Sequence, residues 1–138
     1  MSLISLEKLI GYIVSRLGCV HPYRVGRILM LISWRFKEVY NKDLVCFTVE
    51  GFEAGYYIPE VSDVIKEGVK KDSCYKRDEV RRCAYYICGS VDIEDVSIKN
   101  IVDSVIEQTK DLGDTDLNRL VIKDPRYDEV LKRKTVCT

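Results

Sequence analysis

The sequence predicts a mainly α-helical single domain with one small β-hairpin, and three observations carry that prediction. Apolar residues recur at spacings of three and four over most of the 138 residues, which is typical of amphipathic helices. Residues 44–58 are instead rich in β-branched and aromatic residues around the turn-forming pair Glu50-Gly51. The length and the 46% hydrophobic content suit one core. We therefore expect six or seven helices in one domain, residues 1–138.

Two helices are expected before the hairpin. Apolar residues from Leu3 to Leu17 lie on one face of the first, and Gly18 can end it. The second helix runs roughly from Pro22 to Tyr40, with proline in its first turn. It is apolar on nearly all sides, and Trp34 belongs to that apolar surface. Such a helix is expected at the centre of the fold.

Further helices are expected after the hairpin. Pro59 opens one, and a second, near Arg77 to Cys88, is expected to bury Val80, Cys83, Ala84 and Ile87. A third contains Ile98 to Ile106 and ends near Leu112-Gly113.

Two short helices are expected at the end of the chain. Asp114 or Thr115 can cap the first, and Asp124 can cap the second with Pro125 at its first position. We expect three apolar side chains of this segment to point inward and close the core: Leu117, Leu120 and Tyr127.

Charge and hydropathy exclude several classes of protein. Lys and Arg number 22, as do Asp and Glu, so no net field favours nucleic acid or a membrane. The apolar N-terminus is interrupted by charges, unlike a signal peptide, and no uncharged run is long enough to span a bilayer. We expect a soluble protein without membrane contact, located in the cytoplasm, or in the host cytoplasm if the protein is viral.

Six cysteines are unusual for that compartment and leave two interpretations open. No Cys-x-x-Cys pair occurs, so no metal site is predicted. The cysteines are either small buried apolar residues or disulfide partners whose pairing the sequence does not reveal. A low content of Asn and Gln and a high content of charged residues are typical of proteins from hyperthermophiles, which tolerate intracellular disulfides. That second interpretation indicates a hyperthermophilic archaeon or its virus.

No catalytic constellation occurs, so we predict that the protein is not an enzyme and has no cofactor. His21 is the only histidine and stands in a loop, where a solvated role is commoner than general-base catalysis. The eight glycines are scattered and form no phosphate-binding loop. No serine or cysteine lies in a nucleophile motif.

Charge asymmetry and paired tyrosines supply the candidate contacts. Residues 66–82 hold seven basic and four acidic residues, whereas residues 92–116 hold eight acidic and two basic. A polar helix face normally carries such charge simply to stay solvated, and this is the commoner explanation. The alternative is a basic face for phosphates or an acidic partner, with one tyrosine of each adjacent pair at an interface. The candidate contact residues are Tyr57, Lys76, Arg77, Arg81, Arg82 and Tyr85.

Two segments also resemble a known family. GYYIPEVSDVIKEGV (residues 55–69) follows the two helices and the β segment, and DLNRLVIKDPRYDEVL (residues 116–131) ends the helical order. This layout resembles the Panacea family of antitoxin and adaptor domains over nearly the whole chain. The late segment is similar to the family's closing element, with Ile122 where histidine is usual and Tyr127 at the aromatic position. The resemblance implies binding through protein contacts, without cofactor or catalytic residue.

Two hypotheses of function follow. The first is a non-enzymatic protein-binding domain, antitoxin-like or a regulatory adaptor, whose partner is a toxin or another regulator. The alternative is a small winged-helix-like DNA-binding regulator that uses the basic face from Lys76 to Arg82. The second predicted helix is too apolar to lie in a major groove, which weighs against that alternative.

Overall fold

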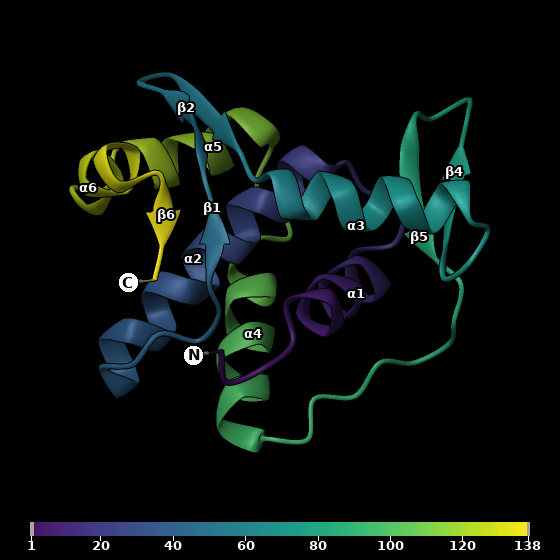
Figure 1. Cartoon of the computed structure of the whole chain (residues 1–138), viewed down its shortest axis with the longest axis horizontal. Helices are drawn as coiled ribbons and strands as arrows, with labels where there is room; N and C mark the ends of the chain where they lie inside the picture. The colour runs from purple at the N-terminus through teal and green to yellow at the C-terminus, as the bar shows by residue number, and fades with distance from the viewer. Residues whose placement is uncertain (1, 138) are drawn as a thin grey trace.

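The computed structural model describes residues 2–137, which form a mainly α-helical fold with small antiparallel sheets, as predicted (Figure 1). The described helices are α1 (Leu6–Leu17), α2 (Pro22–Tyr40), α3 (Pro59–Lys70), α4 (Val96–Thr109), α5 (Asp114–Ile122) and α6 (Arg126–Arg133). The described strands are β1 (Phe47–Thr48), β2 (Glu50–Phe52), β3 (Gly55–Tyr57), β4 (Tyr75–Asp78), β5 (Cys83–Tyr86) and β6 (Thr135–Val136). No helix within residues 2–137 is long and apolar enough to cross a membrane.

Helix α2 is the centre of the fold and has the bounds that the sequence predicts. It contacts α1, α3, α4 and α5, so nearly every side of it is covered. Ile32 is fully buried and Trp34 nearly so. Asn41, in the left-handed conformation, ends the helix, and its N–H donates to the carbonyl of Lys37. The all-round apolar pattern was therefore a correct sign of central placement.

The first hairpin differs in detail from the prediction. Its strands are β2 and β3, and its turn lies at Glu53 and Ala54 rather than at Glu50-Gly51. The preceding strand β1 pairs with β6 at the far end of the chain, so it is not part of the hairpin. Gly51 lies within the pair, where a Cβ would come 2.4 Å from the carbonyl oxygen of Gly55. Glycine is required there by close approach of the two strands.

The predicted helix from Arg77 to Cys88 is wrong, because this segment is the β4–β5 hairpin. The Asp78 carboxylate accepts from the backbone N–H groups of Val80 and Arg81, at 3.0 Å each, and so forms the turn. Arg82 then takes a left-handed φ of 57°. Val80 and Ile87 are exposed, the former by 93%, whereas Cys83 and Ala84 are buried as expected. The helical spacing of these residues was coincidental.

The C-terminal segment is helical and packed on the core, with two corrections. Leu117 and Tyr127 are buried as predicted, but Leu120 is 49% exposed. Val121, one helical turn after Leu117, takes the inward position that was assigned to Leu120. Helix α5 begins after Gly113, with no side-chain cap from Asp114 or Thr115.

The predicted Asp124 contact is present at the start of α6. Its carboxylate accepts from the backbone N–H of Arg126 at 2.9 Å, which is two residues on, as expected. Pro125 has helical dihedral angles but lies just before the first residue of α6, so the predicted start is displaced by one residue.

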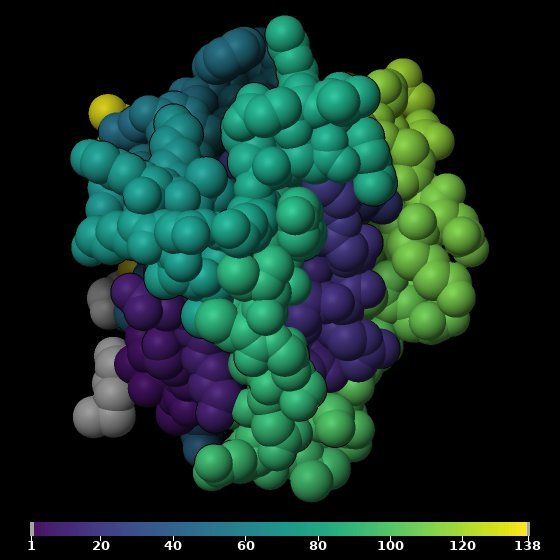
Figure 2. Space-filling view, turned by 90° about the vertical axis from the view of Figure 1, so that its right-hand side faces the viewer, coloured from purple at the N-terminus to yellow at the C-terminus, as the bar shows by residue number. Residues whose placement is uncertain are grey.

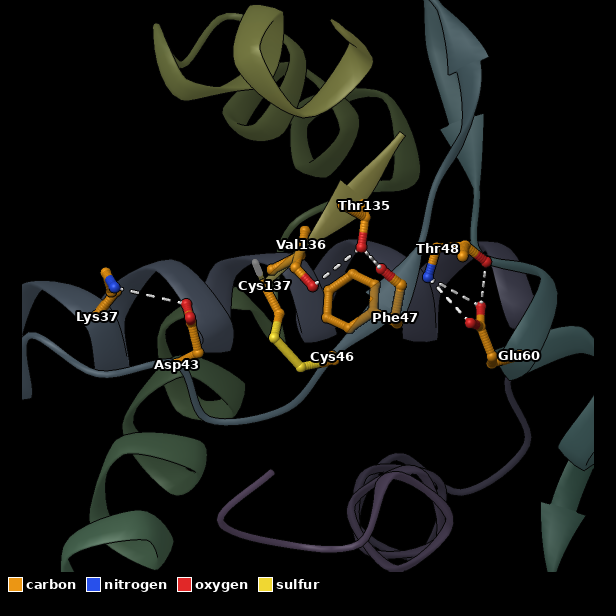
Figure 3. The surroundings of a disulfide bond; sticks show 9 residues. All are labelled: Lys37, Asp43, Cys46, Phe47, Thr48, Glu60, Thr135, Val136 and Cys137. Carbon is orange, nitrogen blue, oxygen red and sulfur yellow. Dashed lines mark hydrogen bonds and ion pairs between the residues drawn. A yellow bond between two sulfur atoms is a disulfide. The ribbon is translucent and has the colours of Figure 1, made fainter. Parts of the chain in front are cut away.

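All six cysteines form disulfides, which decides between the two open interpretations. The pairs are Cys19–Cys83, Cys46–Cys137 and Cys74–Cys88. Figure 3 shows Cys46–Cys137 beside the β1–β6 pair, where the Thr135 hydroxyl donates to the carbonyl of Phe47 at 3.1 Å. The same strand is held from its other side by Glu60, whose carboxylate accepts from the N–H and hydroxyl of Thr48. The end of the described chain is thus fixed to its middle.

Candidate functional site

The predicted contact residues lie on two separate surfaces. Lys76 and Arg77 lie on β4, Arg81 and Arg82 lie in the turn, and Tyr85 lies on β5, so these five share the β4–β5 hairpin. Tyr57 lies on β3, at the other end of helix α3 (Figure 1). The structure therefore brings the basic residues together and separates Tyr57 from them.

The β4–β5 hairpin carries both paired and unpaired basic side chains. Lys76 Nζ lies 2.7 Å from Asp72 Oδ1, and Arg77 Nε lies 3.6 Å from Glu79 Oε2. The Lys76 ion pair is exposed, and hydrogen bonding to Asp72 raises the pKa of Lys76. The Arg81 and Arg82 side chains form no ion pair within residues 2–137. Two of the four predicted basic contacts are thus already neutralised by neighbouring carboxylates.

A small pocket lies where this hairpin faces helix α3, and we call it the basic pocket. It has a volume of about 200 Å³. Its rim carries Lys66, Lys70, Arg77, Arg82 and His21, and its floor is formed by Pro22, Ile65, Val69, Cys83 and Ala84. Figure 2 shows this end of the molecule, where residues 66–90 spread across α1 and the start of α2. No carboxylate lines the basic pocket among the described residues.

A larger depression lies between the β2–β3 hairpin and helix α2, and we call it the aromatic groove. Its volume is about 410 Å³. It is lined by Tyr23, Arg27, Glu50, Gly51, Phe52, Ala54, Gly55, Tyr56 and Tyr57. Phe52 is 70% exposed and Tyr57 52% exposed, so large apolar surface faces solvent here. The Tyr57 hydroxyl donates to the Glu50 carboxylate, and this hydrogen bond raises the pKa of Tyr57.

Arg27 forms the base of the aromatic groove and is only 1% exposed. Its guanidinium carbon lies 3.5 Å from the ring centroid of Tyr23 and 4.2 Å from that of Tyr56. Nε and one terminal nitrogen donate to Asn118 Oδ1 at 3.1 and 3.0 Å. No carboxylate forms an ion pair with Arg27 among the described residues. Its charge is therefore stabilised by cation–π stacking and by hydrogen bonds to the side-chain amide of Asn118.

Core tyrosines hold the groove's outer wall in place. Tyr127 donates its hydroxyl to the carbonyl of Phe52 at 2.6 Å, and Tyr56 donates to the carbonyl of Gly26 at 3.1 Å. The amide of Asn118 donates to the carbonyl of Ala54 at 3.0 Å. Burial raises the pKa of Tyr56 far above its usual value, so its hydroxyl stays protonated as a donor. The β2–β3 hairpin is thereby tied to α2, α5 and α6.

Comparison with models of protein families, with curated proteins and with solved structures found no match to this chain. The resemblance to the Panacea family therefore stays a prediction.

Several residues of these two surfaces were not singled out as contacts from the sequence. Lys66 and Lys70 belong to the basic run, but only the fold shows that they face the hairpin. Arg27 interrupts a helix that is apolar on nearly all sides, and that position was a usable signal of an unusual buried charge. Phe52 carried no such signal, because strand aromatics are more often buried.

Proposed function

We propose that this chain is a non-enzymatic protein-binding domain, antitoxin-like or a regulatory adaptor, which takes a segment of its partner in the aromatic groove. One observation carries the proposal: exposed Tyr23, Phe52 and Tyr57 surround a buried arginine that no carboxylate neutralises. Aromatic residues and arginine dominate binding energy at protein interfaces. The partner segment therefore has an aromatic or aliphatic side chain for the groove.

Rigidity supports the same proposal. Phe52, Ala54 and Tyr56 are fixed by hydrogen bonds to the helices, so binding need not order the backbone of the hairpin. A surface that is already in its bound shape loses less conformational entropy on association. A partner can then bind tightly through a small number of side chains.

We place this domain in the cytoplasm of a hyperthermophilic archaeon, or in the host cytoplasm if it is viral. Three disulfides and a composition poor in amides support that assignment, because hyperthermophiles keep disulfides inside the cell. In other organisms such a set of cross-links belongs to oxidising compartments. The partner is a toxin or another regulator.

Peptide selection tests the groove directly. A phage-displayed library of random peptides is selected on the immobilised, oxidised protein, and the affinity of the enriched peptides is measured by calorimetry. We expect peptides that share an aromatic or aliphatic residue. Phe52→Ala/Tyr57→Ala should weaken them by about tenfold or more, since hot-spot truncations cost about 2 kcal/mol or more.

The matched control is Val39→Ala/Val96→Ala, which removes two exposed apolar side chains from α2 and α4. This variant should bind the selected peptides as the parent does. Equal weakening in both variants, or no enrichment above background, contradicts the proposed groove.

The competing function is a DNA-binding regulator that uses the basic hairpin. A gel-shift titration with mixed-sequence duplex at several salt concentrations distinguishes the two. Duplex binding that weakens steeply with salt, and that Phe52→Ala/Tyr57→Ala leaves unchanged, favours the regulator.

A further inference from the structure

The basic pocket brings four cationic side chains together, and no carboxylate lines it among the described residues. Lys66 and Lys70 stand one turn apart on α3, where like charges repel. Their neighbour Lys71, on the same helix, pairs with Glu67 at 3.6 Å. Neither Lys66, Lys70 nor the Arg82 side chain forms an ion pair within residues 2–137. Among the described residues, the one ion pair on the rim is the exposed contact of Arg77 with Glu79.

The backbone beneath these side chains is held at several points. The Cys19–Cys83 disulfide joins the loop before α2 to strand β5. Beside it, Val20 and Ala84 exchange backbone hydrogen bonds of 2.8 and 3.0 Å. The N–H of Arg82 donates to the carbonyl of Asp78 at 2.7 Å. The hairpin half of the rim therefore keeps its position relative to α2, so charge is preorganised before any ligand arrives.

The chemistry of the lining selects the ligand. Arginine presents a planar fork of N–H groups that matches phosphate oxygens, and lysine supplies a point charge to them. The imidazole of His21 on the rim can add one further N–H donor. The volume of about 200 Å³ has room for a phosphoryl group and a small organic part. The apolar floor at Ile65, Val69 and Ala84 suits that organic part.

We propose that the basic pocket binds a phosphoryl group, with Lys66, Lys70, Arg77 and Arg82 as its cationic contacts. This site lies apart from the aromatic groove and depends on none of its residues. A phosphorylated small molecule and a nucleic-acid backbone share that chemistry, and the probes below distinguish them.

Inorganic pyrophosphate and a mixed-sequence duplex serve as probes of the intact, oxidised protein. Pyrophosphate binding is followed by calorimetry and by amide chemical shifts at low and moderate salt. We expect the largest shifts around His21, in residues 65–70 and in residues 82–84. Lys66→Gln/Lys70→Gln should weaken pyrophosphate by about tenfold or more, since two charge-assisted contacts are lost. The melting temperature of each variant, measured in parallel, verifies that the fold is retained.

The matched control is Lys42→Gln/Lys132→Gln, which removes two exposed lysines that lie outside the basic pocket and form no described ion pair. It changes the net charge equally, so it should leave pyrophosphate affinity within about twofold of the parent. Equal loss in both variants, or shifts spread over the whole surface, overturns the proposal. If Lys66→Gln/Lys70→Gln weakens the binding of pyrophosphate and the duplex does not bind, the ligand is a small phosphorylated molecule. Pocket-dependent binding of both identifies a nucleic-acid backbone.

Discussion

The C-terminal helices and the β4–β5 hairpin are held to the molecule by different forces. Residues 96–133, which form α4, α5 and α6, contain no cysteine and bury an apolar face on α2 and its surroundings. That face consists of Ile98, Val102, Val105, Ile106, Leu117, Val121, Tyr127 and Val130. The hairpin segment, residues 74–88, buries only Tyr75, Cys83 and Ala84. Instead, Cys19–Cys83 attaches it to the loop before α2, and Cys74–Cys88 joins its two ends.

The difference shows what a cross-link allows a surface to do. Hydrophobic burial stabilises in proportion to the apolar area removed from water, about 25 cal/mol per Å², so packed helices must give one face to the core. A disulfide acts mainly by restricting the unfolded chain and needs no such area. The hairpin can therefore expose charge on both sides and still keep a defined shape. The basic pocket depends on that freedom.

The largest expected effect on stability comes from a charge placed on α2, where the C-terminal helices pack. Ile32→Asp puts an unpaired carboxylate into a fully buried site on α2, at a cost of several kcal/mol. Since whole domains are stable by about 5–15 kcal/mol, we expect loss of cooperative thermal unfolding even with all disulfides oxidised. The control is Val39→Asp, on the exposed side of the same helix. A cooperative transition in Ile32→Asp near the parent's temperature contradicts the central role of packing.

An intermediate effect is expected when the hairpin loses one link. Cys74→Ser/Cys88→Ser opens a loop with a sequence separation of 14 and should lower the free energy of unfolding by about 3 kcal/mol. Cys88 is exposed and Cys74 half-buried, so serine itself adds little cost. Urea denaturation of the oxidised proteins measures the difference. A loss below about 0.5 kcal/mol, within the usual range of surface changes, means that the Cys74–Cys88 bridge contributes little to the stability of the hairpin.

The smallest effect concerns the start of α6. Hydrogen bonds from Arg126 hold the pKa of the Asp124 carboxyl below its usual range. Its stabilisation is therefore complete above the unfolded value of about 3.9 and is lost as pH falls through the lower folded value. Asp124→Ala should cost about 1 kcal/mol at neutral pH. Chemical denaturation at pH 7 and pH 3 should show the deficit shrinking in acid. Asp92→Ala, at an exposed position without a described partner, should show neither the deficit nor its pH dependence.

The helices were predictable from sequence because their signals are local. Proline at the first turn and unbroken apolar spacing define α2, whose predicted bounds agree with the structure. Val80, Cys83, Ala84 and Ile87 have the same spacing, yet they lie in a hairpin. What decides their conformation is the turn at Asp78 and the distant cysteines that hold the strands. Pairing between residues 64 or 91 positions apart leaves no trace in local periodicity.

The candidate sites were predictable only as residue types. The run of basic residues was visible in the sequence. Which of them form ion pairs depends on the tertiary structure: Lys76 does, whereas Lys66, Lys70 and Arg82 form none within residues 2–137. Leu120 shows the same limit in a helix. The residue that joins Leu117 on the buried face can lie either three or four positions later in the sequence. In α5 the core takes Val121, and Leu120 turns to solvent.

The order of the cysteines along the chain bears on how the molecule withstands proteases. Each disulfide joins one cysteine at or before residue 74 to one at or after residue 83. The segment between them contains three exposed arginines that are targets for trypsin-like enzymes: Arg77 on β4, and Arg81 and Arg82 in the turn. Hydrolysis of any single peptide bond between residues 74 and 83 leaves two fragments joined by three covalent bridges. The two fragments of a nicked molecule therefore migrate as one band in a non-reducing gel. They separate into two bands only after a thiol reductant is added.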